Sequence, residues 1–119
     1  MNQTSMKVQI GTSSFTAVLE HNTAVDALVE MMEAGPGTIQ MSDYAGFEKV
    51  GPLGTSLPAS NRQTTAKAGD IVLYQGNQIV IFYGSNSWSY TRLGRVEDLT
   101  GWEEALGSGD VTVTFSLEE

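Results

Sequence analysis

The stretch GDIVLYQGNQIVIFYG, residues 69–84, decides the fold class of this chain. It predicts two strands joined at Gly76-Asn77, a pair suited to the positive φ angles of a tight hairpin turn. The second strand, Ile79 to Tyr83, is apolar without a break, which indicates that both of its faces are covered. We therefore expect a central hairpin with a barrel interior on one side and a helix or loop on the other.

Further strands are predicted on both sides of this hairpin. Apolar and polar residues alternate in a hairpin about Gly11, in two short strands about Asp43 to Gly46, in residues 88–96 and in residues 110–119. In residues 88–96 the alternation puts Trp88, Tyr90 and Arg92 on one face. Roughly eight strands, mostly in adjacent antiparallel pairs, favour a mainly β fold with a closed barrel over a sandwich.

Two short helices are predicted to cap this barrel. The first follows Asn22 and ends at Gly35-Pro36-Gly37, with Thr23 and Asp26 as a capping box and an apolar stripe formed by Val25, Leu28, Val29 and Met32. The second lies within residues 99–109, with Thr100 and Glu103 as its capping box and with Leu99, Trp102 and Leu106 packing inward.

The composition limits the classes of function. At 119 residues we expect one domain over residues 1–119, with residues 1–5 flexible. A net charge of −8 and a pI near 4.4 argue against nucleic acid and anionic membranes as partners, because both need clustered Lys and Arg. The start is not signal-like and no apolar run is long enough to span a bilayer, so we expect a soluble, cytoplasmic protein. The absence of cysteine fits any compartment, and we expect a monomer.

Motifs for catalysis and for metal binding are weak. His21 is the single histidine and has no nucleophile elbow to serve, so we expect no catalytic triad. Asp43, Glu48 and Asp70 are scattered without histidine partners, and we expect no metal and no cofactor. The acids from Glu97 onward are typical of a solvated surface, with a cationic protein partner as the alternative.

The candidate ligand-binding residues are aromatic side chains and arginines. Phenol and indole groups can line a pocket, and guanidinium groups suit carboxylates or carbonyls. Residues 51–66 show little periodicity, and we expect a long irregular loop there that borders the site. The alternative is that these aromatics are ordinary core or barrel-rim residues. The candidates are Tyr44, Arg62, Tyr83, Trp88, Tyr90 and Arg92.

Three segments in order, AGDIVLYQGNQIVIFYG, SYTRLGRV and ALGSGDVTVTF, resemble the small bacterial cyclophilin-like family. The resemblance covers nearly the whole chain and implies an eight-stranded antiparallel barrel with helical caps. Prolyl isomerases of this fold use an arginine that donates to the prolyl nitrogen and lowers the barrier to amide rotation. Their Phe-His-Arg motif is not found in this sequence, and Arg92 is the nearest candidate donor.

The leading hypothesis is therefore a non-enzymatic binding module for a small anionic or carbonyl-bearing ligand, or for a peptide. The alternative is a weak or vestigial peptidyl-prolyl cis-trans isomerase. A third hypothesis is a protein-partner role through the acidic surface of the C-terminal third.

Overall fold

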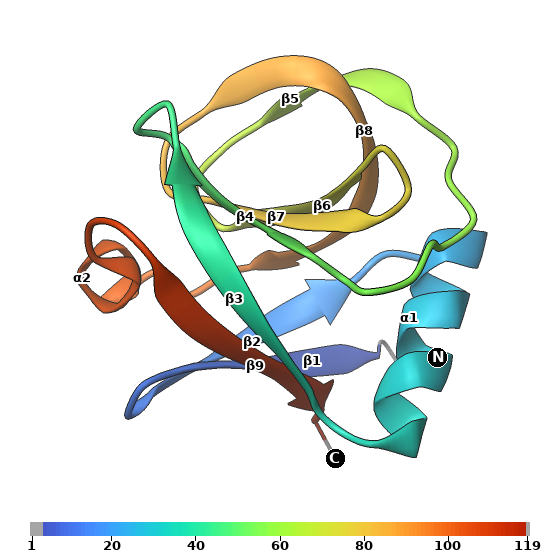
Figure 1. The fold of residues 1–119 in the computed structure, drawn as a ribbon, viewed down its shortest axis with the longest axis horizontal. Helices are drawn as coiled ribbons and strands as arrows, with labels where there is room; N and C mark the ends of the chain where they lie inside the picture. Colours follow the sequence, from blue (N-terminus) through green and yellow to red (C-terminus); the bar gives the residue numbers. More distant parts are fainter. Residues whose placement is uncertain (1–3, 119) are drawn as a thin grey trace.

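A computed structural model describes residues 4–118, which form nine strands and two helices (Figure 1). Of the start predicted to be flexible, residues 1–3 lie outside the described part, and Ser5 already begins a strand. In chain order the elements are β1 (Ser5–Ile10), β2 (Ser13–Leu19), α1 (Thr23–Ala34), β3 (Gly37–Tyr44), β4 (Glu48–Pro52), β5 (Arg62–Ala66), β6 (Asp70–Tyr74), β7 (Gln78–Phe82), β8 (Asn86–Val96), α2 (Trp102–Leu106) and β9 (Val111–Leu117).

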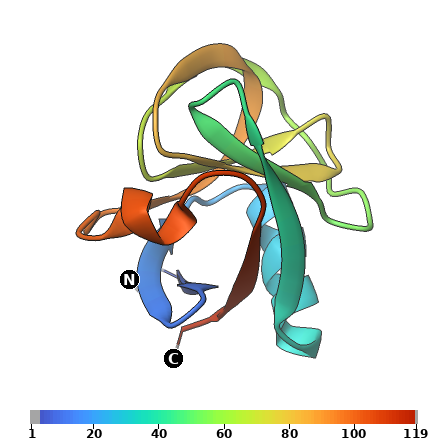
Figure 2. The ribbon, with the colours of Figure 1, turned by 60° about the vertical axis from the view of Figure 1, so that its left-hand side comes forward.

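The strands close into a barrel, as predicted. Neighbouring strands follow the order β2-β1-β9-β3-β4-β7-β6-β8, and a further pairing of β2 with β8 closes this ring of eight strands. Each of these pairings is antiparallel. The helices α1 and α2 lie at opposite sides of the barrel, and Figure 2 shows the same arrangement from a second direction.

Strand β5 stands outside the ring and pairs only with the first half of β8. The irregular loop predicted over residues 51–66 was wrong at both ends, because Gly51 and Pro52 belong to β4 and Arg62–Ala66 form β5. Only Ala66 of this strand is buried, so no apolar alternation marks it, and backbone pairing with β8 defines the strand instead. Together β5 and the start of β8 arch over the outer face of β4, β7 and β6 (Figures 1 and 2).

The central hairpin has apolar packing on both faces, as its unbroken sequence predicted. Ile79 and Ile81 belong to the main core inside the barrel, which both helices help to fill. Val80 and Phe82 point to the other side, where they form a smaller core with Tyr90 and neighbouring residues. The cover on that side is the β5–β8 strand pair, whereas we had expected a helix or loop.

The turn of this hairpin lies one residue earlier than the sequence indicated. The positive φ angles fall on Gln75 and Gly76, at 55° and 78°, and the N–H of Asn77 closes the turn on the Tyr74 carbonyl. Asn77 is therefore the last residue of the turn and not one of its two left-handed positions.

Helix α1 is capped by Asn22, and the predicted capping box of Thr23 and Asp26 was wrong. The Asn22 Oδ1 accepts a hydrogen bond from the Val25 N–H at 2.8 Å. Its Nδ2 donates to the Arg92 carbonyl, also at 2.8 Å, which fastens the start of the helix to β8. One side chain therefore both caps the helix and holds it against the barrel.

Helix α2 also begins differently from the prediction. Its N-cap is Gly101, at φ 77°, with no side-chain cap, while the Thr100 N–H bonds to the Asp98 carboxylate. Leu99 is 38% exposed and does not pack inward as expected. Trp102 and Leu106 are buried as predicted, and the Trp102 indole donates to the Phe82 carbonyl at 2.9 Å.

The two capping assignments for α1 predict opposite outcomes for neighbouring substitutions. Asn22→Ala should destabilise the protein by about 1–2 kcal/mol, because it removes the cap and the bond to β8. Thr23→Ala is the matched control and should change the free energy of unfolding by less than about 0.5 kcal/mol. Urea denaturation followed by circular dichroism measures both. Equal losses for the two variants would contradict the assignment of Asn22 as cap.

Candidate functional site

A pocket of about 390 Å³ lies on the outer face of the central hairpin, beside the start of β8. This volume is within the range of small-molecule sites, roughly 300–1,000 Å³. The strands β3, β4, β6, β7 and β8 all contribute side chains to it. The lining residues are Tyr44, Glu48, Val50, Tyr74, Gln78, Asn86, Trp88 and Tyr90.

The smaller core forms the base of this pocket. Tyr90 is 4% exposed and packs edge-on against Phe82, with ring centroids 5.6 Å apart, and against Tyr74 at 6.3 Å. Asn86 Nδ2 donates to the Tyr90 hydroxyl at 2.9 Å. These contacts fix the Tyr90 ring between the β5–β8 strand pair and the sheet formed by β4, β7 and β6, so the position of its hydroxyl group in the pocket is defined.

Glu48 is the unusual group of the pocket. It lies opposite Phe82 in the β4–β7 pairing and is 6% exposed, and its Oε1 has no hydrogen-bond partner within the described residues. Burial raises the pKa of Glu48 from its ordinary 4.5 to about 7, while a hydrogen bond with the Tyr90 hydroxyl acts in the opposite direction. A carboxyl group therefore faces the pocket with one oxygen free and with its charge sensitive to pH near neutrality.

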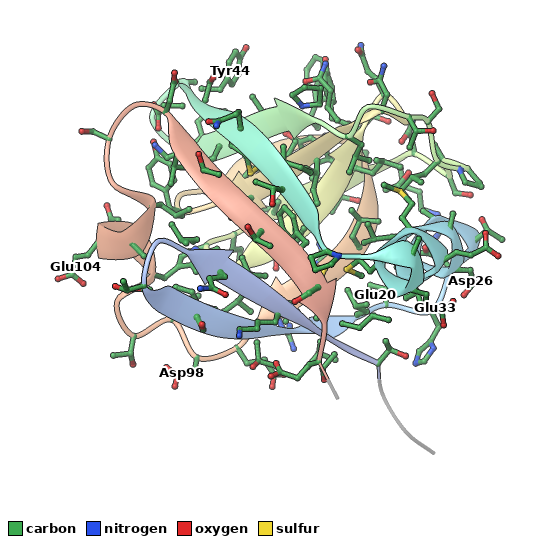
Figure 3. The ribbon with its side chains drawn as sticks, turned by 60° about the horizontal axis from the view of Figure 1, so that its bottom comes forward. Glu20, Asp26, Glu33, Tyr44, Asp98 and Glu104 are labelled. Atoms are coloured by element: carbon green, nitrogen blue, oxygen red, sulfur yellow. The ribbon has the colours of Figure 1, made fainter. Side chains whose placement is uncertain are left out.

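Two exposed aromatic side chains flank the opening. Tyr44 is 59% exposed and Trp88 is 55% exposed, although both are large and apolar for surface positions. Tyr44 stands at the end of β3, at the edge of the molecule (Figure 3), and its ring packs edge-on against Phe47. Exposed aromatic groups gathered around a hollow are typical of binding sites.

The structure brings only some of the predicted site residues together. Tyr44, Trp88 and Tyr90 line the pocket, whereas Arg62, Tyr83 and Arg92 do not. The side chain of Arg62 is exposed on β5, where its backbone lies opposite Tyr90. The predicted common rim of aromatics and arginines is therefore not what the structure shows.

Arg92 is engaged in ion pairs outside the pocket. Its Nη2 lies 3.3 Å from Oδ2 of the buried Asp70, and its Nε lies 3.9 Å from Oε2 of Glu20. Asp70 also accepts from the Lys67 N–H, so the carboxylate that holds Arg92 is itself held by the backbone. The Arg92 cation balances the charge of this buried acid, and the local sequence pattern gives no sign of the pairing.

Tyr83 belongs to a separate polar cluster on the other side of β4. Its hydroxyl donates to Asp43, and Asp43 also pairs at 3.3 Å with Lys49, which is fully buried and donates to the Gly109 carbonyl at 2.6 Å. The hydrogen bond from Tyr83 lowers the pKa of Asp43, and the same bond raises the pKa of Tyr83 to about 12. The buried lysine is therefore satisfied by its neighbours, while Tyr83 and Asp43 also line a second hollow beside Glu103 and Glu104 of α2.

Sequence reasoning missed Glu48 as a member of the site. An acid on a strand that pairs with the apolar stretch 79–82 lies in a covered layer, which would have indicated Glu48. This argument requires the pairing partner and the register, and the local sequence pattern gives neither. Tyr74, Gln78 and Asn86 were missed for the same reason.

The described residues hold no group of three or more His, Asp or Glu side chains placed to bind a metal ion. Neither α1 nor α2, the helices within residues 4–118, has the length and hydrophobicity of a membrane-spanning segment.

A closed eight-stranded barrel with helical caps is the architecture that the sequence resemblance implied. A sequence model of the cyclophilin-like family matches residues 8–116, nearly the whole chain. The chain therefore belongs to the cyclophilin-like family. A comparison with curated proteins gives no significant match.

The raised pKa of Glu48 predicts a specific pH dependence of stability. Because the folded-state pKa lies above the unfolded value, the folded protein binds more protons between about pH 4.5 and 7, so this carboxyl favours folding at the acidic end of that range. The free-energy difference between wild type and Glu48→Gln should shift against the wild type by about 1–2 kcal/mol as pH rises from 5 to 8.

Urea denaturation of both proteins across this pH range measures the difference, which cancels the contributions of the other acids. Glu104→Gln, on α2 and outside the pocket, is the control and should give a nearly flat difference. A flat difference for Glu48→Gln as well would show that Glu48 titrates normally.

Proposed function

We propose that this cyclophilin-like domain is a non-enzymatic binding module whose site is the pocket between Glu48, Trp88 and Tyr90. Its ligand is a small molecule or a peptide side chain with an apolar, preferably aromatic, body. The ligand carries a hydrogen-bond donor that reaches Glu48. The aromatic and amide side chains of the lining supply the remaining contacts.

The observation that carries the proposal is the free Oε1 of Glu48. A buried polar atom without a partner costs about 1–3 kcal/mol, and native proteins seldom leave one unsatisfied. A ligand that donates to this oxygen recovers that cost on binding. Trp88 and Tyr44, exposed beside the same hollow, would bury their rings against the ligand.

The lining does not favour the anionic ligand that the sequence suggested. That expectation rested on Arg62 and Arg92, and neither lines the pocket, whereas the acid Glu48 does. A carbonyl-bearing ligand stays compatible, because Asn86 and Gln78 offer amide donors and a protonated Glu48 can donate as well. A ligand that combines a donor with a carbonyl therefore fits better than a carboxylate.

No specific observation favours the isomerase alternative. Its proposed donor, Arg92, faces Asp70 and Glu20, so it is not aimed at a prolyl nitrogen in this pocket. The rate of cis-trans exchange of a proline-containing peptide in the presence of the protein, measured by NMR, should therefore be the same for the wild type and for Arg92→Ala.

A neutral aromatic probe tests the binding site directly. Titration of ¹⁵N-labelled protein with 2-phenylethanol should shift the Trp88 indole signal and the amide signals of Glu48 and Tyr90. Trp88→Ala should weaken binding about three- to tenfold, as expected for the loss of one aromatic contact. Arg92→Ala and Leu99→Ala are matched controls outside the pocket and should bind as the wild type does. Shifts confined to the Tyr83 cluster, or none at tens of millimolar probe, would refute the proposed site.

A further inference from the structure

We propose that the ligands of this pocket carry an ammonium group that pairs with ionised Glu48, so that binding of the ammonium group competes with protonation of this carboxyl. This inference rests on the proposed function and specifies its ligand class. The exchange is balanced: the carboxyl group releases one proton to solvent, and the ligand cation takes its place beside the carboxylate.

The charges around Glu48 leave room for a cation. Within residues 4–118 no Lys or Arg forms a salt bridge with Glu48. The adjacent Lys49 points to the opposite side of β4, where Gly109 and Asp43 occupy its ammonium group. The free oxygen of Glu48 is thus an acceptor with no cation of its own, and a hydrogen bond from a charged donor is about twice as strong as one from a neutral donor.

The aromatic lining suits the same ligand. Tyr44, Tyr74, Trp88 and Tyr90 surround the pocket from three strands, and aromatic faces attract cations within roughly 6 Å of the ring centre. One cation–aromatic contact of this kind occurs elsewhere in the protein, where the Lys49 ammonium lies 5.6 Å from the centre of the Tyr83 ring. An ammonium group with an apolar body would therefore meet a carboxylate and aromatic faces together.

Glu48 is the group of the lining whose charge changes near neutral pH. The other titratable groups of the lining are phenols: Tyr44 from β3, Tyr74 from β6 and Tyr90 from β8, while β7 contributes the neutral Gln78. Tyr83, directly after β7, lies outside the lining, but the charge of Glu48 contributes to its raised pKa. On β5, the cationic side chain of Arg62 is exposed, and its backbone lies opposite Tyr90. With a pKa of about 7, the Glu48 carboxyl of the ligand-free protein holds a proton below neutrality and loses it above.

Affinity for an ammonium ligand should therefore rise as pH increases through 7 and then level off. A neutral ligand of the same shape lacks this dependence, because it gains little from ionisation of Glu48. The charge of Glu48 thus determines both the ligand preference of the pocket and the pH range in which ligands are released.

Calorimetric titration tests the proposal with probes matched in shape: phenethylamine, 2-phenylethanol and phenylacetate. At pH 8 the amine should bind about tenfold more tightly than the alcohol, and its affinity should fall about tenfold or more at pH 5.5. Phenylacetate should bind most weakly at pH 8. Titrations at pH 6.5 in two buffers of different ionisation enthalpy should show a fraction of a proton released per amine bound.

Variants assign these effects to Glu48. Glu48→Gln should remove the proton release and the preference for amine over alcohol, while Glu104→Gln should keep both. A capped lysine, N-acetyl-lysine methylamide, separates the two sources of an ammonium group: tighter binding than phenethylamine indicates a peptide ligand, and weaker binding indicates a free aromatic amine. Proton release by the wild type needs no variant, so the test holds even if Glu48→Gln folds poorly.

The outcomes separate a failure of this inference from a failure of the proposed function. Equal affinities for amine and alcohol at both pH values, without proton release, overturn the exchange while leaving the binding site intact. Tighter binding of phenylacetate overturns the ligand class. If none of the probes binds, the proposed function itself fails.

Discussion

The three successive pairings of β8 are the constraint on which both the barrel and the pocket depend. Its first residues pair with β5, its middle with β6, and its end with β2, where the ring closes. The closing contact is tight at Gly94, since a Cβ there would lie 2.7 Å from the Val18 carbonyl oxygen. A register shift opposite Ile71 and Val72 lets both Leu93 and Val96 reach the barrel interior although they are three residues apart. Upstream of the shift, Tyr90 faces outward to the pocket.

Strand β4 shows how one segment separates a structural charge from a binding charge. Glu48 and Lys49 are neighbours, both are buried, and they point to opposite faces. Lys49 is satisfied by Asp43 and by the Gly109 carbonyl, and so it joins the β3–β4 hairpin to the chain before β9. Glu48 has an oxygen without a partner. The difference between a paired and an unpaired buried group, more than burial itself, distinguishes the two roles.

The fold followed from local patterns more fully than the site did. The apolar run 79–82 required covered faces, and the alternation of β1, β2 and β9 required a sheet with one buried side. The site depends on which strands become neighbours, and no local pattern specifies that. Arg92 was predicted to be a ligand contact because its strand alternation placed it beside Tyr90, but the position of Asp70 directs its guanidinium elsewhere. Strand β5 was missed because it is defined by backbone pairing and buries a single side chain.

The two tryptophans of this chain lie in opposite environments. Trp102 is 2% exposed, packs edge-on against Phe15, and has its indole N–H bonded to the Phe82 carbonyl, while Trp88 is 55% exposed beside the pocket. Their fluorescence should differ accordingly, with emission at shorter wavelength from the buried indole and at longer wavelength from the hydrated one. The protein therefore carries two intrinsic optical labels, one for the integrity of the barrel and one for occupation of its outer face.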